Sequence, residues 1–230
     1  MDGALVQYYV APAGAHADGA LALLAARAAL RGQVRWSGRA EYVRWRTVMM
    51  TKIVLEASSA DFERVRALPD ALTLCADGRE AAAGEPGAIL VLPPQSRAMA
   101  GPALETLRLA RKRRGRAPEP PTGPTLVLVA ADDLGMHGGK LAAQAAHAAL
   151  LLAERADAQG PTWTAWERAG APLALRRATS TVLAELATRY PGGAVHDAGF
   201  TQVASGSLTV VAVPPDAAEG SQPLHDLAPW

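Results

Sequence analysis

Cysteine is nearly absent from this sequence: Cys75 is the one cysteine in 230 residues. A lone cysteine excludes an intramolecular disulfide framework and is typical of a reducing compartment. Long apolar runs are lacking too, because Arg27 interrupts the one such stretch, residues 20–30, which is far shorter than the ~20 residues that cross a bilayer. The first residues show no basic and apolar secretory leader. From these absences we expect a soluble, cytoplasmic protein.

Lysine is the second scarce residue. Of the 23 basic residues 20 are arginines, and the lysines are Lys52, Lys112 and Lys140. Alanine fills 51 positions, which indicates a compositional bias of the genome rather than a function. Arginine thus occupies most positions where a positive charge suffices. Because an ammonium group is a compact charge with a shiftable pKa, each lysine is a candidate functional residue.

Proline and glycine gather in residues 112–124, which hold four prolines, two glycines and a basic run. This composition continues neither a helix nor a strand, so we interpret the segment as a linker between two domains, residues 1–111 and 125–230. Each half is long enough to bury a core. The net charge of +1 conceals a difference, since residues 1–120 carry +5 and residues 121–230 carry −4.

The second half predicts an alternation of strands and helices. The predicted elements are a strand at 125–131, a helix from 140 to about 158, a strand at 172–177, a helix at 180–190 and a hairpin of 194–203 with 208–213. Thr179 is the predicted N-cap of the second helix. This order implies an α/β fold with a mixed sheet and flanking helices.

The first half repeats this order. Two offsets, 120 and 121 residues, align segments of the halves: 139–150 with 19–30, 178–180 with 57–59, and 208–215 with 87–94. The alanine identities in the first pair carry little weight, but the other two pairs share the offset of 121 residues, which differs by one from that of the first pair. We interpret the pattern as a tandem duplication of one fold. The alternative is two unrelated α/β domains.

Three polar side chains interrupt the alanine and leucine of the helix predicted after the linker. Lys140, Gln144 and His147 are spaced four and three residues apart, which places them on one helical stripe. One interpretation is a solvated face. The other is a functional site, because a solvated face in this chain would carry Arg and Glu. A lysine at a helix start also opposes the helix dipole unless an anion lies nearby.

The predicted hairpin carries Asp197, Thr201 and Thr209, which turn formation and strand propensity would explain singly. Together with the helix they lie in two signatures. Residues 133–148, DLGMHGGKLAAQAAHA, resemble D-L-x-M-x-x-G-K-x-A-A-Q-x-x-H-A, and residues 197–210, DAGFTQVASGSLTV, resemble D-A-G-x-T-Q-[IV]-x-x-G-S-x-T-V. Over about residues 125–215 the chain therefore resembles the archaeal/eukaryotic-type, or type 2, peptidyl-tRNA hydrolase family.

The resemblance implies a small α/β domain with a mixed four-stranded sheet, usually paired as a dimer. It implies cleavage of the ester between a peptide and its tRNA, with peptidyl-tRNA as substrate and with no metal or other cofactor. The functional positions that it carries over are Lys140, Gln144, His147, Asp197, Thr201 and Thr209. Two loop positions depart from the family, which usually has lysine at the place of Gly138 and often at that of Gly135. Both losses would weaken contacts with phosphate.

The chemistry open to these residues is ester hydrolysis by water, since no Ser or Cys lies in a recognisable nucleophile setting. We hypothesise that Asp197 orients or deprotonates the attacking water. Lys140 would pair with Asp197 and stabilise the charge that develops on the carbonyl oxygen or on the 3′ ribose oxygen. The two threonines would hold water or substrate, and Gln144 and His147 would line the site.

The first half lacks these residues. The aligned positions hold Ala20, Leu24, Arg27, Ala76, Glu80 and Ala88. If the repeat is real, this copy is catalytically dead and stands in for the second subunit of the family's dimer, so that one chain forms a pseudo-dimer. Further self-association stays open.

A basic run suggests RNA binding. It consists of Arg111, Lys112, Arg113, Arg114 and Arg116. Basic residues near Trp and Tyr suit a phosphate backbone and unstacked bases, although an ordinary solvated surface explains them equally. We therefore predict a peptidyl-tRNA hydrolase that contacts RNA through this run. The alternative is a non-catalytic RNA-binding or regulatory protein that retains the fold, and a hydrolase of another ester or amide is the third interpretation.

Overall fold

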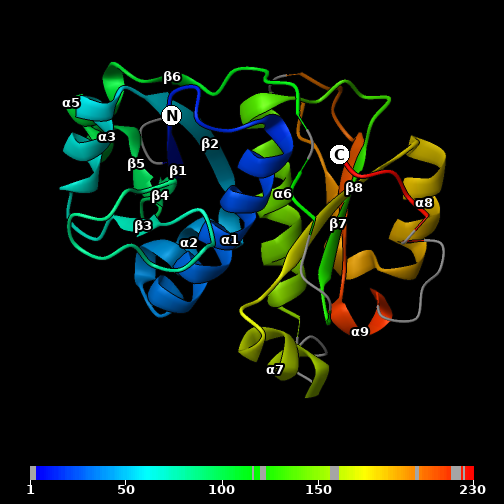
Figure 1. Ribbon diagram of the computed structural model, residues 1–230. Helices are drawn as coiled ribbons and strands as arrows, with labels where there is room; N and C mark the ends of the chain where they lie inside the picture. Colours follow the sequence, from blue (N-terminus) through cyan, green and yellow to red (C-terminus); the bar gives the residue numbers. More distant parts are fainter. Residues whose placement is uncertain are drawn as a thin grey trace.

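The computed structural model describes residues 4–230 except 116, 120–122, 156–160, 200–201, 219–223 and 225. Within this part, two β-sheets lie on either side of a central pair of helices (Figure 1). The first sheet comes from the chain up to residue 109 and the second from residue 126 onward. No helix of the described residues is both long and apolar enough to cross a membrane.

The first sheet has the strand order β3-β4-β1-β2-β6, and β5 pairs with β1 outside this path. Its strands are β1 Leu5–Pro12, β2 Thr51–Ala57, β3 Leu72–Leu74, β4 Ile89–Val91, β5 Gln95–Ser96 and β6 Arg108–Leu109. β1 and β2 are parallel, whereas β4 is antiparallel to β1 and β3. The helices of this half are α1 Asp18–Trp36, α2 Ala40–Val48, α3 Ser59–Arg66, α4 Arg97–Ala100 and α5 Pro102–Glu105.

The second sheet has the strand order β8-β7-β10-β9. Its strands are β7 Leu126–Ala131, β8 Leu173–Ala178, β9 Ala194–His196 and β10 Leu208–Val213. β7 and β8 are parallel, and β10 is antiparallel to β7 and β9. The helices are α6 Gly138–Ala153, α7 Pro161–Arg168, α8 Ser180–Arg189 and α9 Pro215–Ala218, with a 3-10 turn at Pro191–Gly193. The predicted α/β fold with a mixed sheet and flanking helices is confirmed.

The two sheets follow the same path. Strands β3-β4-β1-β2 have the order and directions of β9-β10-β7-β8. The helices α1 and α6 follow the first strand of each half, and α3 and α8 follow the second. Ser58 and Thr179, which the sequence repeat aligns, are the N-caps of α3 and α8. The element order predicted for both halves thus has a counterpart in topology, to which the first half adds β5, β6, α4 and α5.

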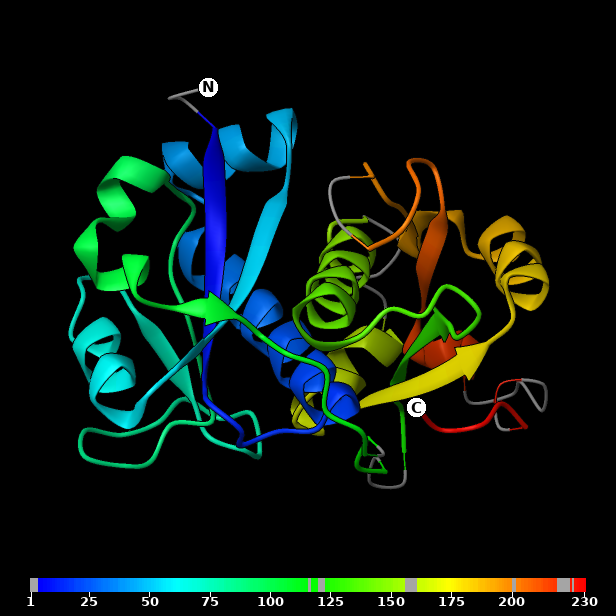
Figure 2. The ribbon, with the colours of Figure 1, turned by 90° about the horizontal axis from the view of Figure 1, so that it is seen from above.

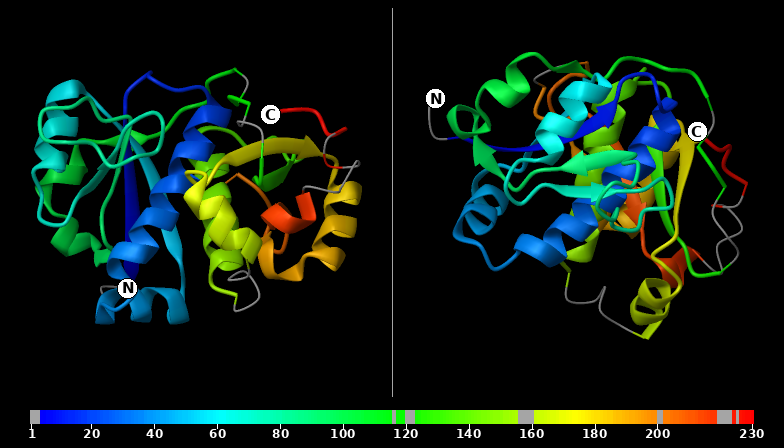
Figure 3. Two further views of the ribbon diagram at one scale, coloured as in Figure 1. Left: turned by 60° about the horizontal axis from the view of Figure 1, so that its bottom comes forward. Right: turned by 60° about the vertical axis from the view of Figure 1, so that its left-hand side comes forward.

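The core follows the layers of the fold. α1 and α6 pack side by side between the inner faces of the two sheets and make the largest contact between any two elements (Figures 1 and 3). Wholly buried alanines such as Ala25 and Ala145 lie in these helices, and small side chains let helix axes approach closely. Separate apolar clusters fill the outer faces, under α3 and α5 on the first sheet and under α8 on the second.

Three elements differ from the predictions. α6 ends at Ala153 instead of near residue 158, and α7 was not predicted. The predicted hairpin is shorter, since β9 ends at His196. The reason is that Asp197 folds the next loop back on itself: the N–H of Gly199 donates to its carboxylate at 2.7 Å, and the N–H of Gly206 donates to its carbonyl oxygen at 2.7 Å.

The linker segment has no helix or strand among its described residues, yet it is packed against both halves. The N–H of Asp18 donates to the carbonyl oxygen of Arg113 at 2.9 Å, and the Asp18 carboxylate accepts from the N–H of Arg113 at 2.8 Å. Farther along, the N–H of Ala117 donates to the carbonyl oxygen of Trp230 at 2.7 Å. From β6 the chain crosses to the second half past the start of α1 (Figure 2).

Candidate active site

The candidate site lies where the start of α6 meets the loop after β9. The N-cap of α6 is His137, so Lys140 and Gln144 lie in its first two turns and on one face. α6 packs against β9 and β10. β9 ends at His196, which brings Asp197 beside this face of α6.

Lys140 and Gln144 converge on one oxygen of Asp197. Lys140 Nζ and Gln144 Nε2 both donate to Asp197 Oδ2, and the N–H of Gly199 donates to Oδ1 at 2.7 Å. The side chains of Lys140 and Asp197 are only 10% and 5% exposed. The interpretation of the polar stripe as a solvated face is therefore wrong for Lys140 and Gln144. Asp197 is the anion that a lysine near a helix start requires.

The cluster contains hydrogen-bond acceptors that no described residue occupies. A carboxylate accepts hydrogen bonds without donating, so the NH2 group of Gln144 must face Asp197 and its Oε1 must face elsewhere. Gln144 Oε1 is buried and has no hydrogen-bond partner among the described residues. A carboxylate offers about four lone-pair sites, and the described donors to Asp197 occupy three of them. A bound water or substrate would therefore find two acceptors here.

His147 lies farther along the same helix. It is seven residues beyond Lys140, about 10 Å along the helix axis, and within the described part of the chain it makes no hydrogen bond to Asp197. Its neighbour is Lys52 of β2, in the contact between the two halves. Burial, and then the charge of Lys52, lower the pKa of His147 to about 3, so the imidazole is neutral at physiological pH. The structure thus separates His147 from the cluster that it was predicted to line.

Lys52 is one of the three lysines, and no role was predicted for it. Its Nζ donates to the carbonyl oxygen of Met50 at 3.2 Å and lies 4.8 Å from the ring centre of Trp45. Burial lowers the pKa of Lys52 to about 7, against the opposing effect of Glu154. Lys52 and His147 are 95 positions apart in the sequence, and no local motif reveals that the charge of one acts on the pKa of the other.

The two threonines predicted on the hairpin differ in what the structure describes of them. Thr209 is wholly buried, and its hydroxyl donates to the carbonyl oxygen of Val195 at 3.1 Å, which ties β10 to β9. Thr201 lies outside the described residues. Gln202 of the same signature was not among the predicted site residues, yet its Oε1 accepts from the N–H of His137 at 3.2 Å. It links the loop after β9 to the N-cap of α6.

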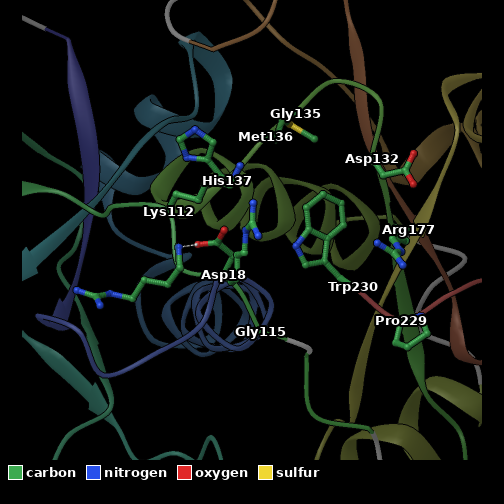
Figure 4. Close-up of a pocket in the computed structure, with 12 residues that line it drawn as sticks. Asp18, Lys112, Gly115, Asp132, Gly135, Met136, His137, Arg177, Pro229 and Trp230 are labelled. Atoms are coloured by element: carbon green, nitrogen blue, oxygen red, sulfur yellow. Dashed lines mark hydrogen bonds between the residues drawn. The ribbon is translucent and has the colours of Figure 1, made fainter.

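A pocket of about 650 Å³ lies at the start of α6, where His137 forms part of its wall (Figure 4). Its walls come from segments far apart in the sequence, among them the linker at Lys112, the loop at Met136 and His137, and Trp230. His137 precedes Lys140 by three residues, about 5 Å along a helix axis. The pocket therefore lies at the end of α6 that carries Lys140.

Three of the five predicted RNA-binding residues line this pocket. Arg111, Lys112, Arg113 and Arg114 are exposed, and the last three line the pocket. Arg113 Nε lies 3.6 Å from a carboxylate oxygen of Glu56. Arg116 lies outside the described residues.

The nearby carboxylates include one with a structural task. Asp133 accepts from the backbone N–H of Ser180 at 3.1 Å and from its hydroxyl at 2.8 Å, and these hydrogen bonds lower the pKa of Asp133. No group of three or more His, Cys, Asp or Glu side chains that could hold a metal ion occurs in the described part of the chain.

The half of the chain that holds the buried Lys–Gln–Asp cluster is similar in sequence to one protein family. Residues 125–225 match the family Peptidyl-tRNA hydrolase PTH2. The chain is 39% identical over 98 residues to the peptidyl-tRNA hydrolase of Haloquadratum walsbyi. The aligned region covers 40% of this chain and 86% of that protein. The chain therefore belongs to the peptidyl-tRNA hydrolase PTH2 family.

Two longer relatives are covered in part. The chain is 43% identical over 97 residues to the probable peptidyl-tRNA hydrolase 2 of Schizosaccharomyces pombe, across 39% of this chain and 47% of that protein. It is 36% identical over 101 residues to the human mitochondrial peptidyl-tRNA hydrolase 2, across 41% and 56%. The chain thus spans about half the length of these two relatives. Lys140, Gln144 and Asp197 lie inside the matched region, whereas α1, the linker and Trp230 lie outside it.

Proposed function

We propose that the chain hydrolyses the ester bond between tRNA and a peptide or N-blocked amino acid, and so recycles peptidyl-tRNA. The observation that carries this proposal is the buried convergence of Lys140 and Gln144 on Asp197. It brings together a cation, a carboxylate and an unused amide acceptor. Membership of the PTH2 family supports the same activity.

In the proposed reaction water is the nucleophile. The remaining lone-pair site of Asp197 and Gln144 Oε1 accept the two hydrogens of the water, which aims its oxygen at the ester carbonyl carbon. As the carbon–oxygen bond forms, one proton moves to Asp197. The Lys140 ammonium stabilises negative charge on the carbonyl oxygen and then on the departing 3′ oxygen. The proton held by Asp197 passes to that oxygen, which leaves as the 3′ hydroxyl.

The test is release of tRNA from N-acetyl-aminoacyl-tRNA. We expect kcat of the Lys140→Ala variant to be about 10²–10³-fold lower than that of the wild type. This is the effect of removing one donor to a developing oxyanion. Its circular dichroism and thermal transition show whether the fold persists. Arg168→Ala, an exposed change on α7, is the control and should turn over normally.

Two results would contradict the proposal. A folded Lys140→Ala variant with the wild-type kcat would remove Lys140 from the chemistry. A wild-type protein that binds RNA and releases no tRNA would favour the alternative of a non-catalytic RNA-binding or regulatory protein.

We also infer that the first half, residues 1–111, is a degenerate tandem copy that takes the place of a second subunit. The shared strand path supports this, and so do reciprocal contacts: α6 packs against β2, and α1 packs against β8. Equivalent parts of subunits related by a twofold axis meet in this reciprocal way. Sedimentation at assay concentrations tests the pseudo-dimer, which predicts full activity in a monomeric chain.

The cytoplasm is proposed as the location because the chain has one cysteine. The name of the human relative places that protein in mitochondria.

The basic run is proposed to contact the RNA backbone. Neutralising residues 111–116 should raise KM and flatten its salt dependence, because each phosphate contact releases a counterion. An unchanged salt dependence would remove the run from RNA binding.

A further inference from the structure

The pocket beside α6 is built mainly from parts of the chain that the family match does not cover. Seven of its twelve lining residues lie outside residues 125–225. They come from the start of α1, from the linker and from the segment that ends in Trp230. The pocket therefore forms where the linker and the start of α1 meet the second half of the chain.

Positive charge prevails in this pocket. Its charged side chains are the cations Lys112, Arg113, Arg114 and Arg177 and the carboxylates Asp18 and Asp132. The Asp18 carboxylate is already engaged by the N–H of Arg113. A phosphate group would thus meet more cations than anions, and the cations stand on two sides of the pocket (Figure 4).

An aromatic ring stands among these charges. Trp230 is partly buried against the core, and its indole lines the pocket between Asp18 and Arg177 (Figure 4). Cations that track a backbone, combined with an aromatic face on which bases stack, are the chemistry by which proteins hold single-stranded nucleic acid. A polar atom in the wall also lacks a partner: His137 Nδ1 is buried and makes no hydrogen bond within the described part of the chain.

The parts of the pocket are fixed to one another by backbone hydrogen bonds. Trp230 accepts from the N–H of Ala117 at 2.7 Å and donates its own N–H to the carbonyl oxygen of Leu175 at 3.2 Å. Arg113 is bound to Asp18 through its backbone. The linker and the main chain of Trp230 are thus held in place before a ligand arrives, which lowers the entropy cost of binding.

We propose that this pocket binds the single-stranded 3′ end of an RNA, with one base stacked on Trp230 and its phosphate between Lys112 and Arg114. The inference deepens the proposed function and rests on it, because the RNA is the strand whose terminal ester reaches Lys140. His137 in the wall of the pocket precedes Lys140 by about one helical turn, so we assign the pocket to the nucleotide next to the ester.

Direct binding tests the proposal. The probe is a 5′-labelled RNA tetranucleotide, ACCA, and the readout is fluorescence anisotropy across a salt series. We expect Trp230→Ala to weaken binding about tenfold, since stacking of one base contributes on the order of a factor of ten. Trp230→Phe keeps an aromatic face and should bind within about threefold of the wild type. The double variant Lys112→Ala/Arg114→Ala should lower the slope of log K against log salt by about 1.4.

A matched control removes two charges elsewhere. Arg31→Ala/Arg168→Ala changes exposed arginines of α1 and α7 that do not line the pocket, and its salt slope should equal that of the wild type. Equal slopes for the two double variants would overturn the proposal. Wild-type affinity in Trp230→Ala would overturn it as well, and so would AMP that competes as well as the tetranucleotide.

The two proposals can fail separately. In the Lys140→Ala background, binding of the tetranucleotide should still depend on Trp230, because Lys140 does not line the pocket. Binding that depends on Trp230 in a protein that releases no tRNA would refute the hydrolase and leave the pocket. Release of tRNA by a protein whose RNA binding ignores Trp230 would do the reverse.

Discussion

The two halves of the molecule have the same strand path but carry different side chains on their central helices. α6 presents Lys140 and Gln144 to a buried carboxylate, whereas the aligned positions of α1 are Ala20 and Leu24. Twelve residues of α1 are buried, and most of them are Ala or Leu. Because packing alone needs only an apolar face, α1 keeps its place in the fold without any of the polar residues that make α6 a candidate catalytic helix.

The loops after the third strand of each half show the same contrast. Asp197 follows β9 and binds two side chains of α6, whereas Ala76 follows β3 and is exposed. Arg27, aligned with His147, donates to the carbonyl oxygen of Asp77 at 2.7 Å and so ties this loop to α1. The first half thus shows which features the fold needs, and the second half shows what the proposed chemistry adds.

The largest expected effect is at Asp197. Replacing Asp197 with Asn removes the proton acceptor and leaves Lys140 without its anion. The kcat for N-acetyl-aminoacyl-tRNA should therefore fall about 10²–10⁴-fold. The matched change in the first half, Ala76→Asn, should leave kcat unchanged, because Ala76 is exposed and far from the cluster in sequence. A similar loss in both variants would break the distinction between an active and an inactive half.

The next effect concerns the contact between the halves. A Cβ added at Gly139 would lie 2.9 Å from the carbonyl oxygen of Val54, and one added at Gly19 would lie 2.8 Å from the backbone nitrogen of Ala117. Despite the better helix propensity of alanine, Gly139→Ala and Gly19→Ala should each lower the free energy of unfolding by about 1–3 kcal/mol in urea titrations. Gly38, with open space around it, is the control. A loss at Gly38→Ala as large as theirs would show that crowding is not the cause.

The pH dependence of stability should separate the halves as well. The pKa of His147 falls from 6.5 in the unfolded chain to about 3 in the fold, so the unfolded state binds the extra proton between these values and stability decreases as pH falls through that window. From pH 6.5 to 5 the wild type should lose about 2 kcal/mol relative to His147→Gln, measured by urea unfolding. The counterpart variant Arg27→Gln retains His147 and should keep the pH dependence of the wild type, since arginine stays charged throughout this range. Parallel pH curves for the wild type and His147→Gln would contradict this.

The smallest effect compares two helix caps. Ser58 accepts from the N–H of Asp61 at 3.2 Å, and Thr179 accepts from the N–H of Val182 at 3.5 Å. Alanine at either position should lower the free energy of unfolding by about 1 kcal/mol, with the larger loss at Ser58 because its hydrogen bond is shorter. Thermal melts of the two variants measure the difference, and a larger loss at Thr179 would reverse the ranking.

Local sequence patterns predicted part of this structure. The cap at Thr179 and the α/β order follow from residues close together in the chain, and both are present. The stripe of α6 was identified by its spacing, and the burial of Lys140 and Gln144 decided between its two interpretations. The hairpin was predicted too long, because strand propensity does not reveal that Asp197 binds its own loop.

Contacts between distant segments were beyond such patterns. The linker was predicted as a basic spacer, but its place in a pocket wall depends on Asp18 and Trp230, which are remote from it in the sequence. The glycine at position 138 has a similar origin. A Cβ there would lie 2.5 Å from the carbonyl oxygen of Ala110, so the segment just before the linker occupies the space that a side chain on this loop would need. This segment leads directly into Lys112, which lines the pocket.

The packing of α1 on α6 within a single chain has a kinetic and evolutionary consequence. Two separate subunits dissociate on dilution, whereas two halves on one chain face each other at a fixed, high effective concentration. The contact between the halves therefore does not depend on how much protein a cell makes. A mutation in α1 also changes one side of that contact without changing the other, so each helix can specialise, one for support and the other for chemistry.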